Sequence, residues 1–313
     1  MQPEPHLRRG RATIDLRGRR VLITGASSGI GEAAAVQFAA AGATVLAVAR
    51  REALLNALVA RIAARGGQAI ALPADLSDLA SVDALVERAG RVDVLVNNAG
   101  RSIRRPLLES LERWHDIERL TTLNYYAPLR LIRGLAPGMI ERGDGHIINV
   151  ASWRVLPEAS PLFGGYIASK AALGVVSRVI ETEWGDLGVH ATTLYYPLVS
   201  TPMMAPTRAY DGVAALTADE AAAWMLDAAR RRPVRVAPRM ALAAKALDVV
   251  APRLVNHLLR QRLIQPEPDL RRRVPVDVPA GGDSAPRNRR AGDTAPRDRR
   301  AADGTPHDRR RGD

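Results

Sequence analysis

The chain has 313 residues, of which 47% are hydrophobic and 25% are charged, a composition typical of a globular protein. It contains no cysteine, which excludes disulfides, thiolate metal sites and cysteine nucleophiles. Its six histidines are scattered without ligand spacing, so we expect no metal, and the net charge of +12 indicates affinity for anionic ligands or surfaces. No apolar run is long enough to cross a bilayer and the N-terminus lacks a signal-peptide core, so we expect a cytoplasmic protein.

Residues 1–19 are basic and aperiodic, which predicts a flexible leader ahead of a folded domain over 20–240. The domain begins with a buried strand, 21–24, followed by a glycine-rich turn and an Ala-rich helix through Ala41. Glycines between a strand and a helix let the backbone approach a pyrophosphate, whose charge the helix N-terminus stabilises. We therefore expect a dinucleotide to contact Gly25, Ser27, Ser28, Gly29, Ile30 and Gly31.

The second expected strand, 44–49, ends at Arg50 and Arg51. An acidic residue at this point would hydrogen-bond the adenosine ribose of NAD, whereas an arginine suits a 2′-phosphate. The sequence therefore favours NADP(H), with Arg50 as the expected contact. The alternative is that both arginines are simply solvated at the start of the next helix.

The ends of the third and fourth expected strands also carry candidate cofactor contacts. Asp75 and Leu76 follow the third strand, where the acid is placed to meet the adenine. Asn98 and Gly100 follow the fourth strand in a tight glycine end, where the cofactor backbone can lie close. A helix over 114–140 then carries Asn124 midway, which we interpret as a buried side chain that bonds water at a kink; a plain surface asparagine is the alternative.

A buried strand over 146–152 ends in Ser152, and a helix opens at Gly164. Tyr166 and Lys170 then lie one turn apart on one helical face. A lysine ammonium beside the phenol lowers the tyrosine pKa and makes it a usable proton donor and acceptor, while Ser152 can hydrogen-bond an oxygen that develops charge. The Tyr-x-x-x-Lys spacing alone is common, but Lys170 is one of only two lysines among 45 basic residues, which argues against coincidence.

Beyond this helix the alternation of elements continues. We expect a strand over 190–196, a mobile substrate lid over 203–217, a helix over 218–231 and a short strand over 234–237. Six or seven strands alternating with helices predict an α/β fold with one doubly wound, mostly parallel Rossmann sheet, and ligands at the carboxyl ends of its strands.

Taken together, the motifs resemble those of the short-chain dehydrogenase/reductase superfamily across residues 18–240. The resemblance implies that Tyr166 is the general acid/base and that Lys170 tunes it and holds the nicotinamide ribose. It further implies that Ser152 polarises the substrate carbonyl and that Asn124 anchors a proton-relay water. The motifs that carry it are Thr24-Gly-Ala-Ser-Ser-Gly-Ile-Gly31, Asn97-Asn-Ala-Gly100, Asn124, Ser152, Tyr166-x-x-x-Lys170 and Pro197–Thr201.

The same resemblance implies that Val199 and Thr201 contact the nicotinamide carboxamide, and that the helices after the fourth and fifth strands form a homo-oligomer interface. Two features depart from the family pattern. Leu198 stands where a glycine is usual, so the local turn is expected to differ. The 14 positions from Ser152 to Tyr166 are one more than expected, a difference that the glycine pair before Tyr166 is placed to absorb.

A narrower likeness is to the reductase domain of bacterial fatty acyl-CoA reductases, which make long-chain aldehydes. It rests on the segments Asn98–Arg105, Trp114–Arg119, Gly145–Asn149, Tyr196–Pro206, the helix near Glu220, and Arg232–Ala237. It implies hydride delivery to a thioester carbonyl without a covalent enzyme intermediate, as the missing cysteine requires. Arg104 and Arg105 would meet coenzyme A phosphates; the alternative is that they are solvated loop arginines.

The C-terminal part divides in two. Residues 241–265 show helical apolar spacing interrupted by Pro252, which predicts a helical extension packed on the domain, with a basic amphipathic pair in peripheral membrane contact as the alternative. Residues 266–313 repeat a ten-residue unit of Arg, Asp, Pro and Gly, which predicts a disordered tail. Interleaved aspartates and the lack of aromatics argue against specific nucleic-acid binding by this tail.

Three interpretations of function remain open at this point. The first is an NADP(H)-dependent oxidoreductase acting on a small, lipid-like molecule, a long-chain fatty acyl-CoA or aldehyde. The second is a related reductase of a ketone or secondary alcohol, because the sequence does not define the substrate pocket. The third is a non-catalytic NADP-sensing protein, against which the complete set of Asn124, Ser152, Tyr166 and Lys170 argues.

Overall fold

The computed structural model describes residues 13–204 and 212–263. The chain divides into two units, Met1–Gln265 and Pro266–Asp313, and every described residue belongs to the first. The tail predicted over 266–313 lies outside the described residues. So do positions 1–12 of the predicted leader and positions 205–211 of the predicted lid.

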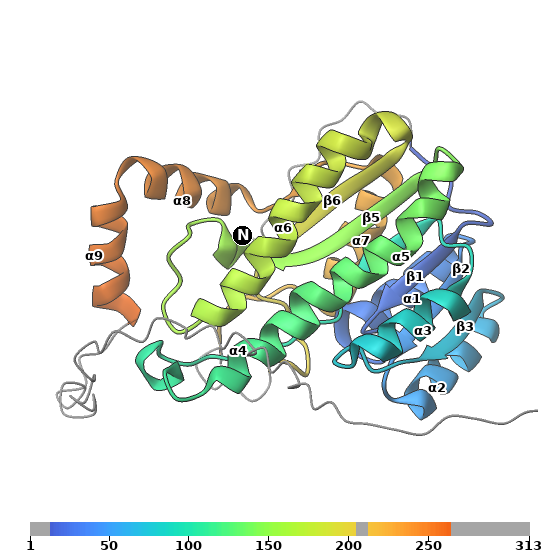
Figure 1. Ribbon diagram of the computed structural model, residues 1–313, viewed down its shortest axis with the longest axis horizontal. Coiled ribbons are helices and arrows are strands. Elements are labelled where there is room, and N and C mark those ends of the chain that lie inside the picture. Colours follow the sequence, from blue (N-terminus) through green and yellow to red (C-terminus); the bar gives the residue numbers. More distant parts are fainter. Residues whose placement is uncertain (1–12, 205–211, 264–313) are drawn as a thin grey trace, which may run out of the picture. The chain divides into compact units, whose positions relative to one another are not determined.

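A single seven-stranded parallel sheet forms the centre of the first unit (Figure 1). Its strand order is β3-β2-β1-β4-β5-β6-β7, which confirms the predicted doubly wound fold. The order reverses between β1 and β4, and in such sheets ligands bind outside the carboxyl ends of the strands at this point. The strands are β1 (Arg20–Thr24), β2 (Thr44–Ala49), β3 (Gln68–Pro73), β4 (Val94–Asn97), β5 (Gly145–Ser152), β6 (Val189–Tyr196) and β7 (Arg235–Val236).

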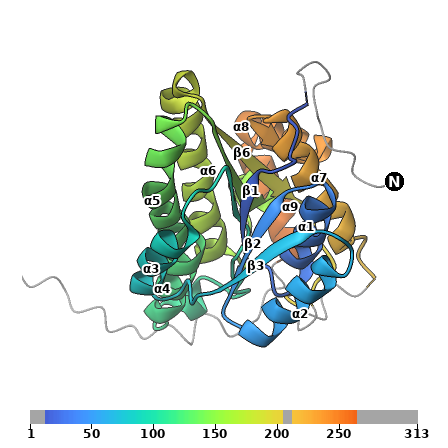
Figure 2. The same ribbon diagram turned by 90° about the vertical axis from the view of Figure 1, so that its right-hand side faces the viewer.

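Helices cover both faces of this sheet (Figure 2). Helices α1, α2 and α7 pack on one face, and α3, α5 and α6 pack on the other. Successive residues of a strand serve the two faces in turn: Val21 and Ile23 join one apolar cluster and Leu22 joins the other. The helices are α1 (Gly29–Ala40), α2 (Glu52–Ala63), α3 (Leu79–Ala89), α4 (Trp114–Thr121), α5 (Ala127–Glu141), α6 (Gly164–Trp184) and α7 (Ala218–Arg231).

The long helix predicted over 114–140 is interrupted in the middle. Between α4 and α5 the backbone forms a π-helical turn, Thr122–Tyr126, and Asn124 lies within it, fully buried. A π-turn inserts an extra residue into a helix and is a recognised cause of kinks. The structure thus confirms the predicted buried asparagine at a local irregularity.

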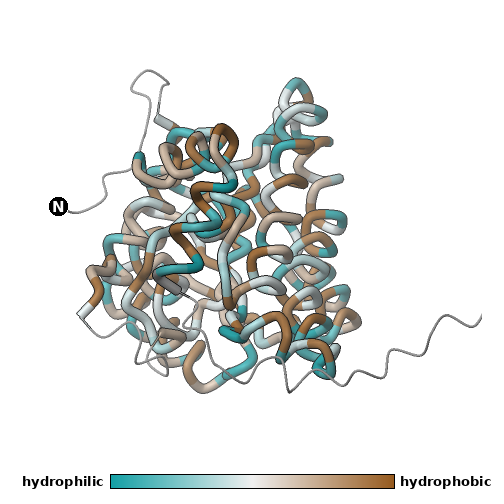
Figure 3. The backbone as a smooth tube through the Cα atoms, turned by 90° about the vertical axis from the view of Figure 1, so that its left-hand side faces the viewer, coloured by the Kyte–Doolittle hydropathy of each residue, from teal (hydrophilic) through white to brown (hydrophobic). Residues whose placement is uncertain are grey.

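Two further helices, α8 (Arg239–Val250) and α9 (Pro252–Leu263), follow β7 and lie beside the carboxyl ends of the strands (Figure 1). Pro252 begins α9, as the sequence predicted. The base of α8 packs on the domain, because Ala241 is buried against Leu156. Hydrophobic and hydrophilic stretches alternate along the helices on this side (Figure 3). None of the helices in the described part of the chain is long and apolar enough to cross a membrane.

The predicted flexible leader is wrong for residues 13–19. Leu16 is buried at 2% exposure, and the Ile14 amide donates to the Arg230 carbonyl at 2.8 Å. The Thr44 amide also donates to the Arg19 carbonyl, at the start of β2. This segment is therefore part of the folded domain, because its Leu16 side chain belongs to one of the apolar clusters of the core.

Candidate active site

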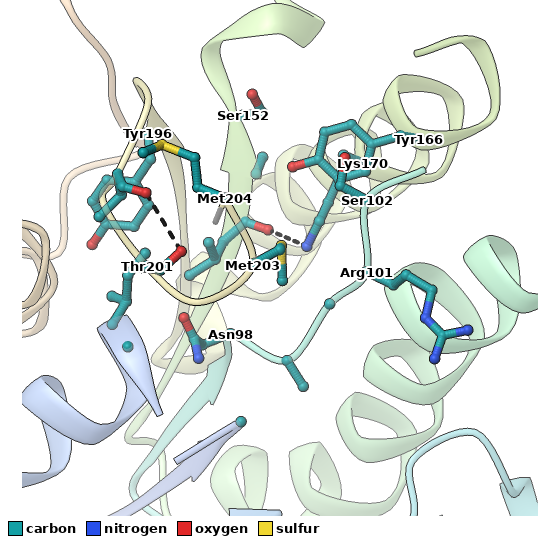
Figure 4. Close-up of a pocket in the computed structure, with 18 of the residues that line it drawn as sticks. Asn98, Arg101, Ser102, Ser152, Tyr166, Lys170, Tyr196, Thr201, Met203 and Met204 are labelled. Carbon is teal, nitrogen blue, oxygen red and sulfur yellow. Dashed lines mark hydrogen bonds between the residues drawn. The ribbon is translucent and has the colours of Figure 1, made fainter. Parts of the chain in front are cut away.

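Tyr166 and Lys170 occupy successive turns of α6 and point into a common cavity (Figure 4). Lys170 is buried at 3% exposure, and its Nζ donates to the Val150 carbonyl of β5 at 2.8 Å. Burial lowers the pKa of Lys170 to about 8, because the ammonium has lost most of its water. The strand carbonyl fixes the position of the ammonium in the cavity.

Ser152 ends β5, and its side chain faces the same cavity as the Tyr166 hydroxyl (Figure 4). The Tyr166 ring lies against Phe163 in an edge-on arrangement, with centroids 6.3 Å apart. The loop between Ser152 and α6 includes a residue with an uncommon backbone conformation. There Leu162 adopts a left-handed backbone, φ 71°, and its carbonyl accepts the Arg105 amide at 2.7 Å.

Gly164 and Gly165, the glycine pair before Tyr166, open helix α6. Both belong to the first turn of α6 and have ordinary helical backbone. Gly165 serves packing: a Cβ atom there would lie 2.7 Å from Ile117 and 3.1 Å from Leu120, both in α4. The glycine therefore lets α6 approach α4 closely.

The Asn124 side chain does not line the cavity. It links Arg101, in the loop after β4, to Ser169 of α6. Its Oδ1 accepts the Arg101 amide at 2.8 Å, and its Nδ2 donates to the Arg101 carbonyl at 2.9 Å and to Ser169 Oγ at 3.0 Å. Both amide hydrogens are thus engaged by protein. A water bound by this side chain would have to use the second lone pair of Oδ1.

The glycine-rich turn leaves room for a ligand by omitting side chains. Gly25 and Gly29 both have positive φ values, 72° and 58°. A Cβ on Gly31 would lie 2.4 Å from the Gly25 carbonyl oxygen, so only glycine fits there. Similarly, a Cβ on Gly100 would lie 3.1 Å from Asn124 Oδ1 and 3.2 Å from Lys170 Nζ. The backbone forms a cradle of the kind that accepts a dinucleotide.

Thr24 is a functional residue that the motif analysis did not single out. Its buried hydroxyl accepts the amides of Asn98 and Ala99 at 2.9 and 3.0 Å and donates to the Val96 carbonyl. It joins the end of β1 to the loop after β4, on which Asn98 and Gly100 lie. The signal for this role in the sequence is a hydroxyl residue at the end of a strand, directly before a glycine turn.

The two arginines after β2 behave differently. Both line the cavity, but it is Arg51 whose guanidinium donates to Ser27 Oγ at 3.0 Å and to Ser28 Oγ at 3.2 Å. The sequence predicted Arg50 as the contact and not Arg51.

The predicted adenine contact Asp75 has a lowered pKa. Burial of the carboxyl raises this pKa, but hydrogen bonds from Ser77 and the charges of Arg50 and Arg101 outweigh that effect and leave the pKa below its usual value.

The cavity has a volume of about 1100 Å³, at the upper end of the size range of ligand pockets. It brings together every predicted catalytic and cofactor-contacting residue except Gly31 and Asn124, which lie behind its wall. Apolar side chains line the cavity in two places: Trp153, Phe163 and Met240 lie on the side of the loop after β5 and of α8, and Leu198, Met203 and Met204 come from the loop after β6, which passes next to Gly29. Sequence patterns did not identify this apolar lining as a set, because its residues come from separate loops and from α8.

The two arginines expected at coenzyme A phosphates also occupy different surroundings. Arg104 lines the cavity. Arg105 does not; its guanidinium lies 3.5 Å from the buried carboxylate of Asp116 and 3.8 Å from Glu109. Arg105 is therefore occupied by structural ion pairs, and Arg101 and Arg119 join Arg104 at the cavity instead.

Comparison with known proteins agrees with this geometry. The family model for short chain dehydrogenases matches residues 19–211. A fatty acyl-CoA reductase of Mycobacterium tuberculosis is 67% identical over 259 residues, covering 82% of this chain and 88% of the relative. A fatty acyl-CoA reductase of Acinetobacter baylyi is 44% identical over 249 residues, covering 78% of this chain and 84% of the relative.

Solved structures give the same result. A short-chain dehydrogenase from Sphingobium yanoikuyae in complex with NADPH superposes with a TM-score of 0.66 at 30% identity, covering 79% of this chain and 98% of that chain. Its sheet and helices therefore match nearly over their full length. With a family model that spans more than half of its length and these relatives, the chain belongs to the short-chain dehydrogenase family and is an oxidoreductase.

Proposed function

We propose that this protein is an NADP(H)-dependent reductase of long-chain fatty acyl thioesters or of the corresponding aldehydes. The observation that carries the proposal is one continuous cavity, which runs from the glycine turn past Lys170 and Tyr166 to an apolar end at Trp153 and Phe163. An apolar end beside the proton-transfer pair suits a hydrocarbon chain. Two relatives that share most of this chain are fatty acyl-CoA reductases, which supports the same substrate class.

The cofactor assignment rests on the cradle and on charge. The glycine turn has room for a pyrophosphate, and Arg50 and Arg51 supply positive charge where an adenosine 2′-phosphate would lie. Solved relatives bind NADPH or NADP, in agreement with this choice. When bound, the reduced nicotinamide supplies the hydride.

The residues of the chain then manage the proton and the developing charge. Ser152 donates a hydrogen bond to the carbonyl oxygen of the substrate, and Tyr166 transfers its proton to that oxygen. The Lys170 ammonium stabilises the phenolate that remains. A thioester so reduced becomes a hemithioacetal, which releases the thiol and leaves the aldehyde; the chain contains no cysteine to form a covalent thioester.

The test is NADPH oxidation by the purified protein against a panel of acyl-CoAs, aldehydes and ketones, each repeated with NADH. We expect turnover with long-chain acyl-CoAs or aldehydes and a preference for NADPH. A Tyr166→Phe variant should lose about 100-fold or more in kcat, because general acid catalysis contributes that much.

Each alternative gives a distinct result in this panel. Turnover of ketones or secondary alcohols without acyl-CoAs or aldehydes would reject the substrate class and keep the reductase. Equal NADPH consumption by the wild type and by Tyr166→Phe would reject the catalytic role of the tyrosine. Binding of NADPH without turnover of any substrate would identify a cofactor-sensing protein instead.

We also propose that the protein is a homo-oligomer. Val175 and Val179 on α6 are 64% and 45% exposed, and Tyr126 at the start of α5 is 48% exposed. Helices α5 and α6 lie next to each other on one face of the sheet (Figure 2). A second copy placed on this face would cover apolar side chains that otherwise contact water.

A further inference from the structure

A second hollow lies between the loop after β5 and the two C-terminal helices. It has a volume of about 240 Å³, and we refer to it as the arm groove. Its floor comes from the segment 153–161 and its other wall from α8 and α9. The lining residues are Trp153, Arg154, Pro157, Ala159, Ser160, Pro161, Ala244, Leu247, Val255, Leu258 and Leu259.

The arm groove adjoins the active-site cavity. Trp153, Arg154 and Pro161 line both hollows, and Trp153 follows directly after Ser152. Arg154 is the one charged residue among the described lining residues of the groove. Its guanidinium lies 4.8 Å from the centre of the Phe163 ring and 6.0 Å from that of Trp153, so its charge rests against aromatic faces at the junction.

The lining of the groove limits what it can hold. A peptide or another copy of the chain would bring backbone amides and carbonyls, and the groove offers almost no polar side chains to pair with them. Unpaired polar groups in an apolar site are costly, so such an occupant is disfavoured. A hydrocarbon has no such groups and gains from every methylene that leaves water.

We propose that the arm groove binds the distal part of the substrate's alkyl chain and thereby sets the preferred chain length. This inference rests on the proposed function, since it takes a long-chain acyl group to reach from Ser152 into the groove. Each methylene that enters the groove should tighten binding about fourfold, from the free energy of burying a CH₂ group. Short chains end inside the main cavity and should gain nothing from the groove.

Two neighbouring alanines of α8 provide a matched test. Ala244 lines the groove, whereas Ala243 is exposed and does not. We would measure kcat/KM for NADPH-dependent reduction of acyl-CoAs from C8 to C18 with wild type, Ala244→Phe and Ala243→Phe. The added ring at position 244 should fill the groove and lower kcat/KM for the longest chains at least tenfold, by roughly the discrimination a hydrophobic pocket achieves. Octanoyl-CoA should be reduced at an unchanged rate by all three proteins.

A second pair of variants, on α9, introduces a charge into or outside the groove and checks the result. Leu258 lines the groove, and Leu254, one turn earlier, is half-exposed outside it. Leu258→Arg should shift the preference to shorter chains, and Leu254→Arg should leave the wild-type profile. The octanoyl-CoA rate of each variant reports whether it is folded and active.

The outcomes separate the two proposals. If no acyl-CoA or aldehyde of any length supports NADPH oxidation by the wild type, the proposed function fails. If the wild type is active but Ala244→Phe and Leu258→Arg keep its chain-length profile, the groove inference fails alone. An unchanged profile together with vesicle binding that Leu258→Arg abolishes would assign the groove to a lipid surface and would equally overturn the inference.

Discussion

Lys170 is the residue whose charge state should govern the reaction. Its ammonium is buried beside Tyr166, and burial lowers its pKa to about 8. Lys170 therefore carries its positive charge below pH 8 and loses it as the pH rises through about 8. Without the charge the phenolate of Tyr166 is no longer stabilised, so we expect kcat/KM for carbonyl reduction to fall about tenfold per pH unit above the break.

The measurement is the pH profile of kcat/KM, which reports groups of the free enzyme. A Lys170→Met variant should be strongly impaired, and its residual activity should lack a break near pH 8. A break that persists in Lys170→Met would show that another group titrates there and would contradict the assignment to Lys170.

Local geometry explains which residues could be predicted from sequence. Residues four apart on a helix share a face whatever the tertiary structure, so Tyr166 and Lys170 follow from their spacing. Arg50 and Arg51 are different, because adjacent side chains point in different directions. Arg51 precedes the first residue of α2 and reaches the serines of the glycine turn, a direction that depends on how α2 docks.

At the scale of elements, the junction of β1 with the loop after β4 holds the cofactor side of the site in place. Thr24 Oγ1 accepts two backbone amides in a buried position. Thr24→Val keeps the shape but removes the acceptor of the Ala99 amide, which costs about 1–3 kcal/mol, and leaves the Asn98 amide with only the Val96 carbonyl at 3.1 Å. We expect a lower free energy of unfolding and, because Asn98 shifts, a higher KM for NADPH.

Chemical denaturation and cofactor kinetics would test this expectation. Thr24→Ser, which keeps the hydroxyl, should recover most of both effects. Thr44→Val serves as the matched control, because its hydroxyl donates to the Gln68 side chain at the sheet edge and it should change stability by about 0.5 kcal/mol or less. An equal loss in Thr24→Val and Thr44→Val would refute a special role for the β1–β4 junction.

The order and type of the elements were predictable, but the form of their interruptions was not. The sequence indicates a kink at Asn124, because asparagine is a poor helix-interior residue. That the kink is a π-turn depends on partners 23 and 45 positions away, Arg101 and Ser169. Leu16 shows the same limit, since nothing in its short basic segment indicates that Leu16 is buried while Ile14 stays partly exposed.

At the scale of the molecule, the walls of the cavity and of the arm groove come from segments distant in the chain. Helical spacing predicted the two C-terminal helices and favoured their packing on the domain. It could not show that only the base of α8 is buried, while Val249 and Val250 are 71% and 83% exposed. The apolar end of the site therefore depends on tertiary docking that periodicity does not encode.

His146 lies at the amino end of β5, away from the active site, and is fully buried. Its Nε2 pairs with Thr192 Oγ1 at 2.9 Å, and the Thr192 hydroxyl in turn donates to the Pro233 carbonyl. The imidazole must therefore be the donor, which assigns its proton to Nε2. Its Nδ1 has no hydrogen-bond partner, so a second proton on the ring would meet no acceptor.

This arrangement predicts how the stability of the whole protein depends on pH. Burial, together with the charges of Arg232 and His190, lowers the pKa of His146 well below its usual value of 6.5, and Asp144 opposes this only weakly. The unfolded chain then binds a proton near pH 6.5 that the folded chain refuses. The free energy of unfolding therefore keeps this contribution above pH 6.5. Below pH 6.5 it decreases by about 1.4 kcal/mol per pH unit as the pH falls.

Urea denaturation at pH 7.0, 6.0 and 5.5 would measure this dependence. His146→Gln removes the titrating group, so its free energy of unfolding should fall less steeply than that of the wild type, by the same ~1.4 kcal/mol per pH unit. His257→Gln, at an exposed position of α9, should keep the wild-type slope. Because the comparison uses slopes, a lower overall stability of His146→Gln does not affect it. Parallel curves for the wild type and His146→Gln would show that the imidazole is protonated equally in the folded and unfolded chains, against the geometry around His146.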